Sequence, residues 1–310
     1  MSTSSTLSPH QGGKLPLLAR PRNESSGFSL TFVTEQENSL NKMFFIAVIV
    51  ALPVGLGSEV LAQDGIDQPL NEVFQTELVY PQEKGAFQFT SVATFSRPDK
   101  NFSNDLTIEY GLTHAWQISL EWESFARKKA DNGLMSHGSG DVRIGTKYSF
   151  MNIRGSNFHS AIGFELGLPA ASAKAQISER QIEYEPYVIV AKDFPNLSRL
   201  QLFTQLGLNF AHPVTRSEDS RAVKTVEWNS GMFVPYRRAR ITTEISWSKS
   251  ANENSVYFTP GVVWKLPRNV EVGAGVPIGL TRDADSFRMI VKLVYEFGGA
   301  GDRQNERLAH

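Results

Sequence analysis

The sequence predicts an all-β protein, a closed antiparallel transmembrane β-barrel of about 12 strands that covers residues 85–297. Three observations predict it. Apolar and polar residues alternate in runs of about ten residues. This alternation is the pattern of a strand with one apolar and one polar face. The connections between these runs alternate between long and short. The only strongly apolar run, Met43–Leu56, is too short to cross a bilayer as a helix.

The alternation is clearest in Trp116–Trp122, where every second residue is apolar and Gln, Ser and Glu stand between them. Side chains that alternate in this way point to opposite faces of a strand. A tilted strand of about ten residues is long enough to span the hydrocarbon of a membrane. Comparable runs occur at Asp141–Phe150, Leu200–Phe210, Arg240–Trp247, Asn269–Leu280 and Phe287–Phe297.

The connections favour a barrel whose strands run up and down through the membrane. Bacterial barrels have long outer loops and short periplasmic turns. Backbone groups in lipid have no water to pair with, so such a sheet has to close on itself. Pro186, Pro235, Pro260 and Pro277 fall inside predicted strands and imply bulges or displaced strand ends. The long connections are Arg97–Asn104, Arg127–Gly138, Ala170–Arg180, Pro213–Lys224 and Lys249–Asn254, and the short ones include Leu112–Ala115, Arg237–Ala239 and Pro267–Asn269.

The regions outside the barrel are predicted from composition. Residues 43–62 have the features of a signal peptide, with Lys42 before the apolar run and small or tolerated residues at Val60–Ala62, so cleavage is expected after Ala62. Residues 1–42 lack periodicity and are interpreted as a spurious or disordered extension; an unusually long signal peptide is the alternative. We expect residues 63–84 to be a periplasmic lead-in and residues 298–310 a disordered tail.

Charge and cysteine content exclude several functions. The net charge of -1 gives no electrostatic reason to expect nucleic acid as a partner. The absence of cysteine excludes disulfides, iron–sulfur clusters and thiolate metal sites. The histidines show no metal-ligand spacing, and no glycine-rich phosphate loop is present. We therefore expect no metal, no cofactor and no enzymatic activity.

Several stretches together resemble one family of bacterial barrels. They are residues 109–123, 140–150, 164–170, 184–194 and 258–297, the last of which reads FTPGVVWKLPRNVEVGAGVPIGLTRDADSFRMIVKLVYEF. These stretches are similar to the MetA-pathway of phenol degradation family, whose members are often labelled transporters. The resemblance implies an outer-membrane barrel that passes small, aromatic compounds. It defines no site residues to carry over.

The polar face of the strands gives the candidate lumen residues. They are Glu109, Glu121, Glu123, Asp141, Arg143, Lys147, Glu165, Glu185, Glu244, Arg288, Lys292 and Glu296. One interpretation is a structural network of ion pairs that fills the interior. The other is a pore in which the excess of carboxylates favours cations over anions. Few aromatic residues share this face beyond Phe203, Phe233, Tyr187 and Tyr257, which does not favour aromatic solutes.

Barrel size sets the expected function. Eight-stranded barrels are filled by side chains and those of 16 to 18 strands hold open channels, so about 12 strands predict a narrow or partly plugged passage. We expect a channel or transporter for small solutes in the outer membrane of a Gram-negative bacterium. Its expected partners are outer-membrane lipid and the barrel-assembly machinery. A structural or adhesive barrel is the alternative function. The weakest hypothesis is a hydrolase built on Ser136–Ser139 with Asp141.

Overall fold

The computed structural model describes residues 70, 73–97, 99–129, 133–171, 177–178, 180–214 and 223–298. The predicted extension (1–42) and signal peptide (43–62) lie outside these residues, as does the tail from residue 299. The described part of the chain is nearly all β-strand, and its helical content is a single 3-10 turn, η2 (Ile153–Gly155). No helix within these ranges is long and apolar enough to span a membrane.

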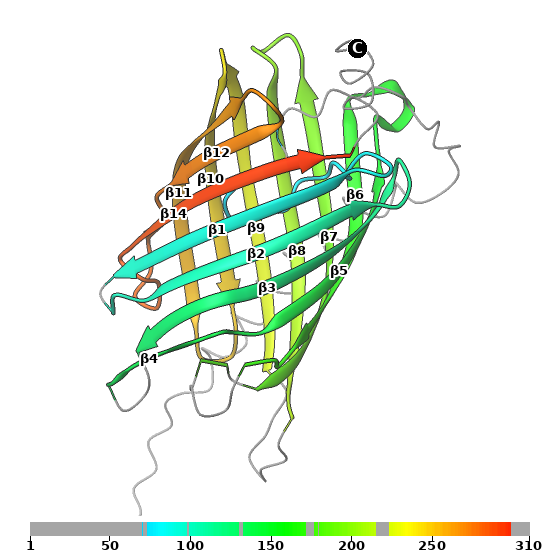
Figure 1. Ribbon diagram of the computed structural model, residues 1–310. Coiled ribbons are helices and arrows are strands. Elements are labelled where there is room, and N and C mark those ends of the chain that lie inside the picture. Colours follow the sequence, from blue (N-terminus) through cyan, green and yellow to red (C-terminus); the bar gives the residue numbers. More distant parts are fainter. Residues whose placement is uncertain are drawn as a thin grey trace, which may run out of the picture. The chain divides into compact units, whose positions relative to one another are not determined.

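The strands form one antiparallel sheet that closes on itself (Figure 1). The first strand, β1, pairs along its whole length with the last, β14, so the sheet has no free edge at this seam. The strands are β1 (Phe87–Arg97), β2 (Phe102–Gly111), β3 (Trp116–Lys129), β4 (Met135–Gly138), β5 (Val142–Phe150), β6 (Phe158–Leu168), β7 (Gln181–Phe194), β8 (Leu200–Pro213), β9 (Val223–Tyr236), β10 (Ala239–Lys249), β11 (Asn254–Leu266), β12 (Val270–Gly275), β13 (Ile278–Gly279) and β14 (Phe287–Phe297).

The fourteen strand segments make twelve spans of the wall. β4 and β5 pair with β3 in one register, as the pairs Ala126 with Gly138 and Trp122 with Val142 show. β12 and β13 likewise keep one register against β14. Each of these two pairs of segments is one interrupted span, so the closed barrel of about 12 strands predicted from the sequence is confirmed.

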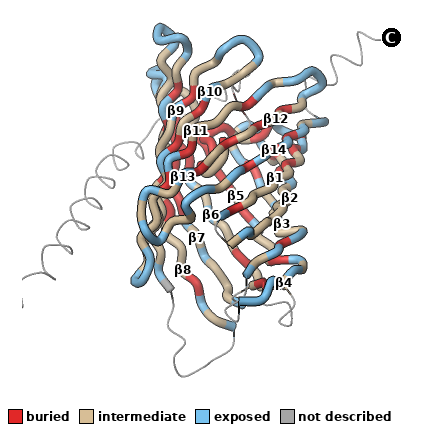
Figure 2. The backbone as a smooth tube through the Cα atoms, turned by 90° about the vertical axis from the view of Figure 1, so that its left-hand side faces the viewer, coloured by how far each residue is buried: buried red, intermediate tan, exposed pale blue. Residues whose placement is uncertain are grey.

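The outer face of the barrel is apolar. Side chains such as Ile108, Leu120 and Ile144 are almost half exposed, although each lies in the middle of the sheet. Their strand neighbours on the inner face are less exposed, and Glu109 and Gly145 among them are buried, so the exposure of successive residues alternates along the same strands (Figure 2). An apolar band on the outside is the surface with which a membrane barrel contacts lipid.

Bulges or displaced strand ends were expected at the strand prolines; Pro186, Pro235 and Pro260 introduce no bulge, and Pro277 lies in the interruption between β12 and β13. Pro186 coincides with a gap in the β7–β8 ladder, but the pairs Tyr184 with Phe210 and Tyr187 with Gly207 on either side keep the same register. Among the pairings of the described residues, a register shift occurs instead between β2 and β3, where Ser124 of β3 is the extra residue between the partners of Asn104 and Asp105. A proline removes one ladder hydrogen bond, and here the flanking pairs hold the register without an added residue.

The hydrophobic core lies inside the barrel. Apolar residues that precede β1 pack against inward side chains of the wall, including Tyr187, Ile189, Phe203 and Phe233. These four wall residues are at most 7% exposed. Three of the four inward aromatic residues, Tyr187, Phe203 and Phe233, therefore pack against the chain's own N-terminal segment, whereas Tyr257 contacts Asp285 and Arg288. The residues of that segment in the core are Leu70, Val73, Leu78, Val79 and Tyr80, with Phe74 packed against them.

Candidate functional site: the plugged lumen

Residues 73–82, which we call the plug, lie inside the barrel rather than ahead of it. Leu78 and Val79 are at most 1% exposed, and the plug is bonded to inward side chains of β3, β5, β8, β10, β11 and β14. Residues 63–84 were expected to form a periplasmic lead-in; residues 73–82 of this segment instead contact the inner face of the wall, and Glu83 and Lys84 are exposed. The physical reason is that its apolar side chains face inward aromatic residues, which bury them from water.

Glu244 of β10 is the main anchor of the plug. Its carboxylate accepts hydrogen bonds from the backbone N–H of Phe74 at 2.9 Å, from that of Gln75 at 3.0 Å and from the hydroxyl of Thr76 at 2.9 Å. Glu244 is 1% exposed, so these donors replace the water that a buried carboxylate would otherwise lack. With the plug in place, this charge therefore holds the plug backbone.

Two buried lysines hold plug carbonyl groups. Lys147 of β5 donates to the carbonyl of Leu78 at 2.8 Å and lies 3.2 Å from the carboxylate of Glu77. Lys292 of β14 donates to the carbonyl of Val73 at 2.6 Å. A buried ammonium group is costly unless it is paired, and the plug supplies the partners. Both lysines are thus part of the attachment of the plug to the wall.

The end of the plug nearest to β1 is fixed by amides and a histidine. The backbone N–H of Gln82 donates to Gln117 at 2.9 Å. Gln201 donates both to the Tyr80 hydroxyl and to Asp193. His159 accepts a hydrogen bond at Nδ1 from a backbone N–H, so its Nε2 carries the proton and donates to Asp193 at 2.9 Å. This end is held by a polar network from four strands, β3, β6, β7 and β8.

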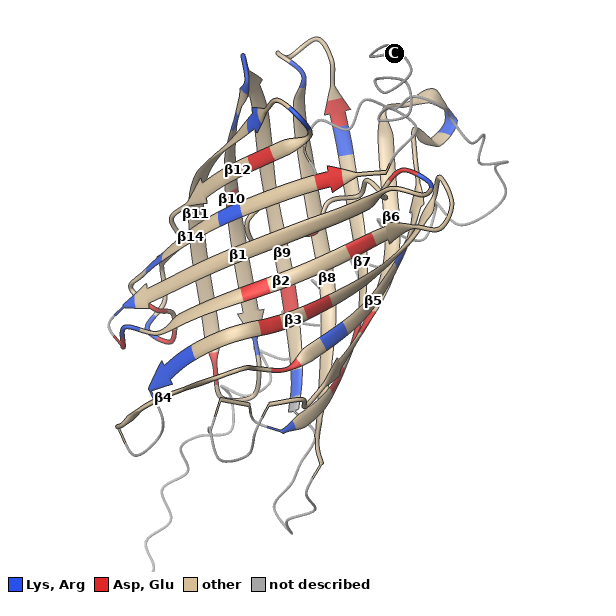
Figure 3. Ribbon diagram, viewed as in Figure 1, with Lys and Arg blue, Asp and Glu red and all other residues tan. Residues whose placement is uncertain are grey.

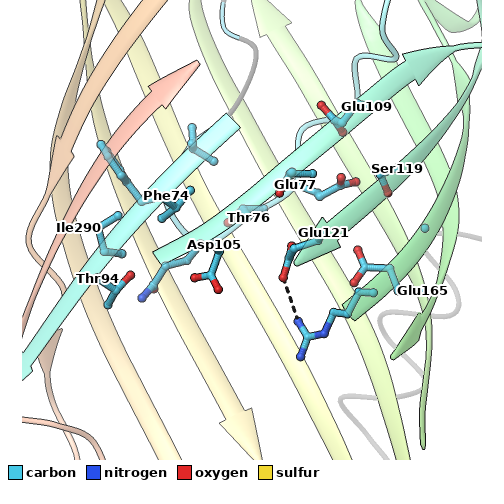
Figure 4. Close-up of a pocket in the computed structure, with 16 residues that line it drawn as sticks. Phe74, Thr76, Glu77, Thr94, Asp105, Glu109, Ser119, Glu121, Glu165 and Ile290 are labelled. Atoms are coloured by element: carbon cyan, nitrogen blue, oxygen red, sulfur yellow. Dashed lines mark ion pairs between the residues drawn. The ribbon is translucent and has the colours of Figure 1, made fainter. Parts of the chain in front are cut away.

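A cavity of about 350 Å³ remains beside the plug, between it and strands β1, β2, β3, β5, β6 and β14 (Figure 4). Its titratable lining residues are Glu77, Asp105, Glu109, Glu121, Arg143 and Glu165. Five are carboxylic acids and one is a base. The acids of β2 and β3 and the base of β5 lie on neighbouring strands of the wall (Figure 3).

The carboxylates of this cavity are only partly neutralised. The guanidinium of Arg143 lies 3.2 Å from Glu183 and 3.9 Å from Glu121. Glu109 is held by amide donors of Gln88 and Gln117, each at 2.6 Å, rather than by a cation. Glu165 has no ion pair within the described ranges. A low-dielectric wall around unbalanced carboxylates produces a negative potential that attracts cations.

The structure separates the predicted lumen residues into three groups. Glu109, Glu121, Arg143 and Glu165 line the cavity. Lys147, Glu244 and Lys292 hold the plug. The others lie apart: Glu123 pairs with Lys128, Arg288 pairs with Asp285, Asp141 binds Ser178 and the Ala171 N–H, Glu185 lies beside Gly207, and Glu296 lies opposite Gln88 at the β1–β14 seam.

Sequence reasoning missed two acids of the cavity. Glu77 belongs to the plug, whose sequence has no period that would place it inside a barrel. Asp105 falls in the unbroken alternation of β2, which places it on the inner face beside Thr107 and Glu109. Asp105 could have been predicted from the alternation of its strand. An unpaired acid that faces lipid is costly, so Asp105 is expected on the inner face.

The hydrolase hypothesis required Ser139, His137 and Asp141 to act together. The Ser139 hydroxyl accepts a hydrogen bond from the Trp122 ring nitrogen at 2.7 Å, and Asp141 is bound to Ser178. His137 is exposed and no hydrogen bond joins it to either residue in the part of the chain that is described. The arrangement needed for an activated serine is therefore not formed there. Within the same residues no group of three or more potential metal ligands occurs.

Together the closed sheet, the apolar outer face and the polar interior define a porin-like outer-membrane β-barrel. The protein belongs to the HAEPLYID-like family, whose model matches residues 83–296. The comparison with curated proteins finds no match. The family model does not confirm the narrower resemblance to the MetA-pathway family, which stays a prediction.

Solved structures share the fold at low identity. An outer membrane channel from Pseudomonas putida F1 aligns with a TM-score of 0.56 and 10% identity, covering 73% of this chain and 100% of that one. The KdgM porin aligns with a TM-score of 0.48 and 14% identity, covering 68% of this chain and 99% of that one. The first alignment supports the barrel architecture.

Proposed function

We propose that this protein is an outer-membrane channel for small solutes and that its lumen favours cations over anions. The observation that carries the proposal is the cavity beside the plug, where five carboxylic acids face one guanidinium. Rings of acidic side chains select cations in other channels because they offset the loss of hydration inside a narrow pore. The apolar outer face supports a location in lipid.

The plug sets the size of what can pass. With residues 73–82 in place, the lumen keeps a cavity rather than a wide pore, which is in line with a barrel of 12 spans. Small hydrated ions are the solutes that such a space admits most readily. Passage of larger solutes requires the plug to shift within the barrel or leave it. The aromatic solutes that the MetA-pathway resemblance implies belong to this second group.

Reversal potentials in planar bilayers test the proposed selectivity. A potassium chloride gradient across the wild-type protein should give a potential of the sign that cation passage produces. The variant Glu121→Gln/Glu165→Gln should bring this potential closer to zero, because it removes two of the cavity charges. The matched control is Glu253→Gln, which removes a charge from the exposed connection between β10 and β11. Equal potentials in all three proteins would contradict the proposal.

A structural or surface barrel without transport is the second candidate function. The observation that favours it is the number of bonds that hold the plug, since Glu244 alone accepts three. If neither the wild type nor a variant without residues 73–82 carries current in any salt, this candidate replaces the channel. Export by a signal peptide at residues 43–62 and insertion by the barrel-assembly machinery remain part of both proposals.

A further inference from the structure

Three wall glycines form a recess in which the ring of Phe74 lies. Gly261 of β11 and Gly275 of β12 are paired across the ladder, and Gly273 lies two residues away on the same face. A Cβ atom at Gly275 would stand 2.8 Å from the Phe74 ring and one at Gly273 would stand 3.1 Å from it. A Cβ at Gly261 would overlap the ring. The wall therefore lacks side chains where a planar ring is seated.

Two buried charges surround the recess and bind the backbone next to the ring. Glu244 accepts the N–H of Phe74, and Lys292 donates to the carbonyl of Val73. The Lys292 ammonium also lies 5.6 Å from the centroid of the Phe74 ring. The recess thus recognises three features at once: a flat ring, an N–H donor two carbons from that ring, and a carbonyl attached to the nitrogen.

Thr242 of β10 adds a polar group that the plug does not satisfy. Its hydroxyl is buried, with the residue 1% exposed, and it has no hydrogen-bond partner in the described part of the chain. The same hydroxyl lies 2.9 Å from the position that a Gly261 Cβ would occupy, so it faces the recess. A buried hydroxyl without a partner costs free energy that a better-matched occupant recovers.

We propose that the recess of Gly261, Gly273 and Gly275 is a binding site for arylethylamines and their N-acyl derivatives, and that Phe74 is its resident occupant. The aryl ring takes the place of the Phe74 ring, and the nitrogen donates to Glu244. An N-acyl oxygen accepts from Lys292. Binding displaces the first residues of the plug and so enlarges the lumen. The inference rests on the proposed channel function for the route by which the ligand arrives.

Direct binding to the purified full-length protein tests the site without relying on current. Equilibrium dialysis in detergent micelles would compare 2-phenylethylamine with 2-cyclohexylethylamine, which has a thicker, non-planar ring of similar size. Wild type has to expel Phe74 before it binds, so Phe74→Ala should bind 2-phenylethylamine about tenfold more tightly or better. The cyclohexyl compound should bind Phe74→Ala clearly more weakly than the aryl compound.

Two double variants locate the ligand. Phe74→Ala/Gly275→Val places a side chain in the vacated recess, and Phe74→Ala/Glu244→Gln removes the carboxylate that binds the nitrogen. Each should lose most of the affinity gained by Phe74→Ala. The heat-dependent gel mobility of the barrel shows whether each variant is folded. If Phe74→Ala/Gly275→Val does not fold, Phe74→Ala/Glu244→Gln still decides the test.

The proposal is overturned if Phe74→Ala binds no better than wild type, or if the folded double variants bind as well as Phe74→Ala. It is also overturned if the aryl and cyclohexyl compounds bind equally. Absence of current in bilayers bears on the channel function alone, since dialysis measures binding whether or not the barrel conducts.

Discussion

The carboxylate of Glu244 and the backbone N–H of Phe74 form a 2.9 Å hydrogen bond between residues 170 positions apart in the sequence. This bond joins the wall of the barrel to the segment that occupies its lumen. Because Glu244 also accepts from Gln75 and Thr76, one buried side chain holds three consecutive plug residues. The state of the lumen therefore depends on this wall residue.

Glu244→Leu should loosen the plug. The change leaves the N–H groups of Phe74 and Gln75 without their acceptor, which costs about 1–3 kcal/mol for each buried donor that stays unpaired. We expect a larger single-channel conductance in planar bilayers than in wild type. Glu253→Gln, in an exposed connection, should leave the conductance unchanged. A Glu244→Leu protein with wild-type conductance would show that the plug does not limit passage.

Arg143→Gln should increase the preference for cations. Arg143 is the one base among the titratable cavity residues, and it lies within electrostatic range of Glu121, Glu165, Glu183 and Glu185. Its removal leaves those carboxylates uncompensated, so the reversal potential in a salt gradient should move further in the cation-selective direction. A move toward anion selectivity would mean that ions pass along another route.

Gly163→Ala should destabilise the barrel and disturb the plug. Gly163 lies directly across the ladder from Tyr187, and a Cβ at Gly163 would overlap the Tyr187 ring. The Tyr187 hydroxyl donates to Glu77 of the plug at 2.8 Å, so moving the ring breaks this bond. Overpacking of this kind costs about 1–3 kcal/mol, measurable by denaturant unfolding in lipid vesicles. Adding Tyr187→Ala should relieve the overlap, and an unrelieved loss would contradict this explanation.

Leu120→Lys tests the apolar outer face. Leu120 is 47% exposed and pairs with Ile108 and Ile144 on neighbouring strands. A lysine that faces lipid near the midplane costs about 2–4 kcal/mol. The free energy of unfolding in vesicles should fall by that amount, whereas Leu120→Ala should lower it less. Equal effects of the two changes would place this face outside the hydrocarbon.

The wall could be predicted from the sequence because its two faces meet different surroundings. In Trp116–Trp122 the alternation of apolar and polar residues follows directly from lipid on one side and a polar interior on the other. The prolines left two outcomes open, a bulge or a displaced strand end: the pairs on both sides of Pro186 hold the register, whereas Pro277 lies in the interruption between β12 and β13.

The plug could not be predicted in the same way. Apart from the bond between Gln82 and Gln88, its hydrogen bonds described here reach residues between 27 and 219 positions away, so no local period records them. Gly273 and Gly275 of the wall leave room for a ring, but that ring belongs to Phe74, which no local pattern links to them. The acidic lumen was expected because acidic residues lie at the polar positions of the alternating strands. Which of these charges bind the plug and which line the cavity depends on three-dimensional contacts.

The position of the seam has a consequence for biogenesis. Residues 73–82 are made before any strand of the wall, and β14, which completes the cylinder, is made last and carries Lys292. In the closed barrel β14 contacts both β1 and the plug, so the strand that completes the cylinder is also bonded to what the cylinder contains.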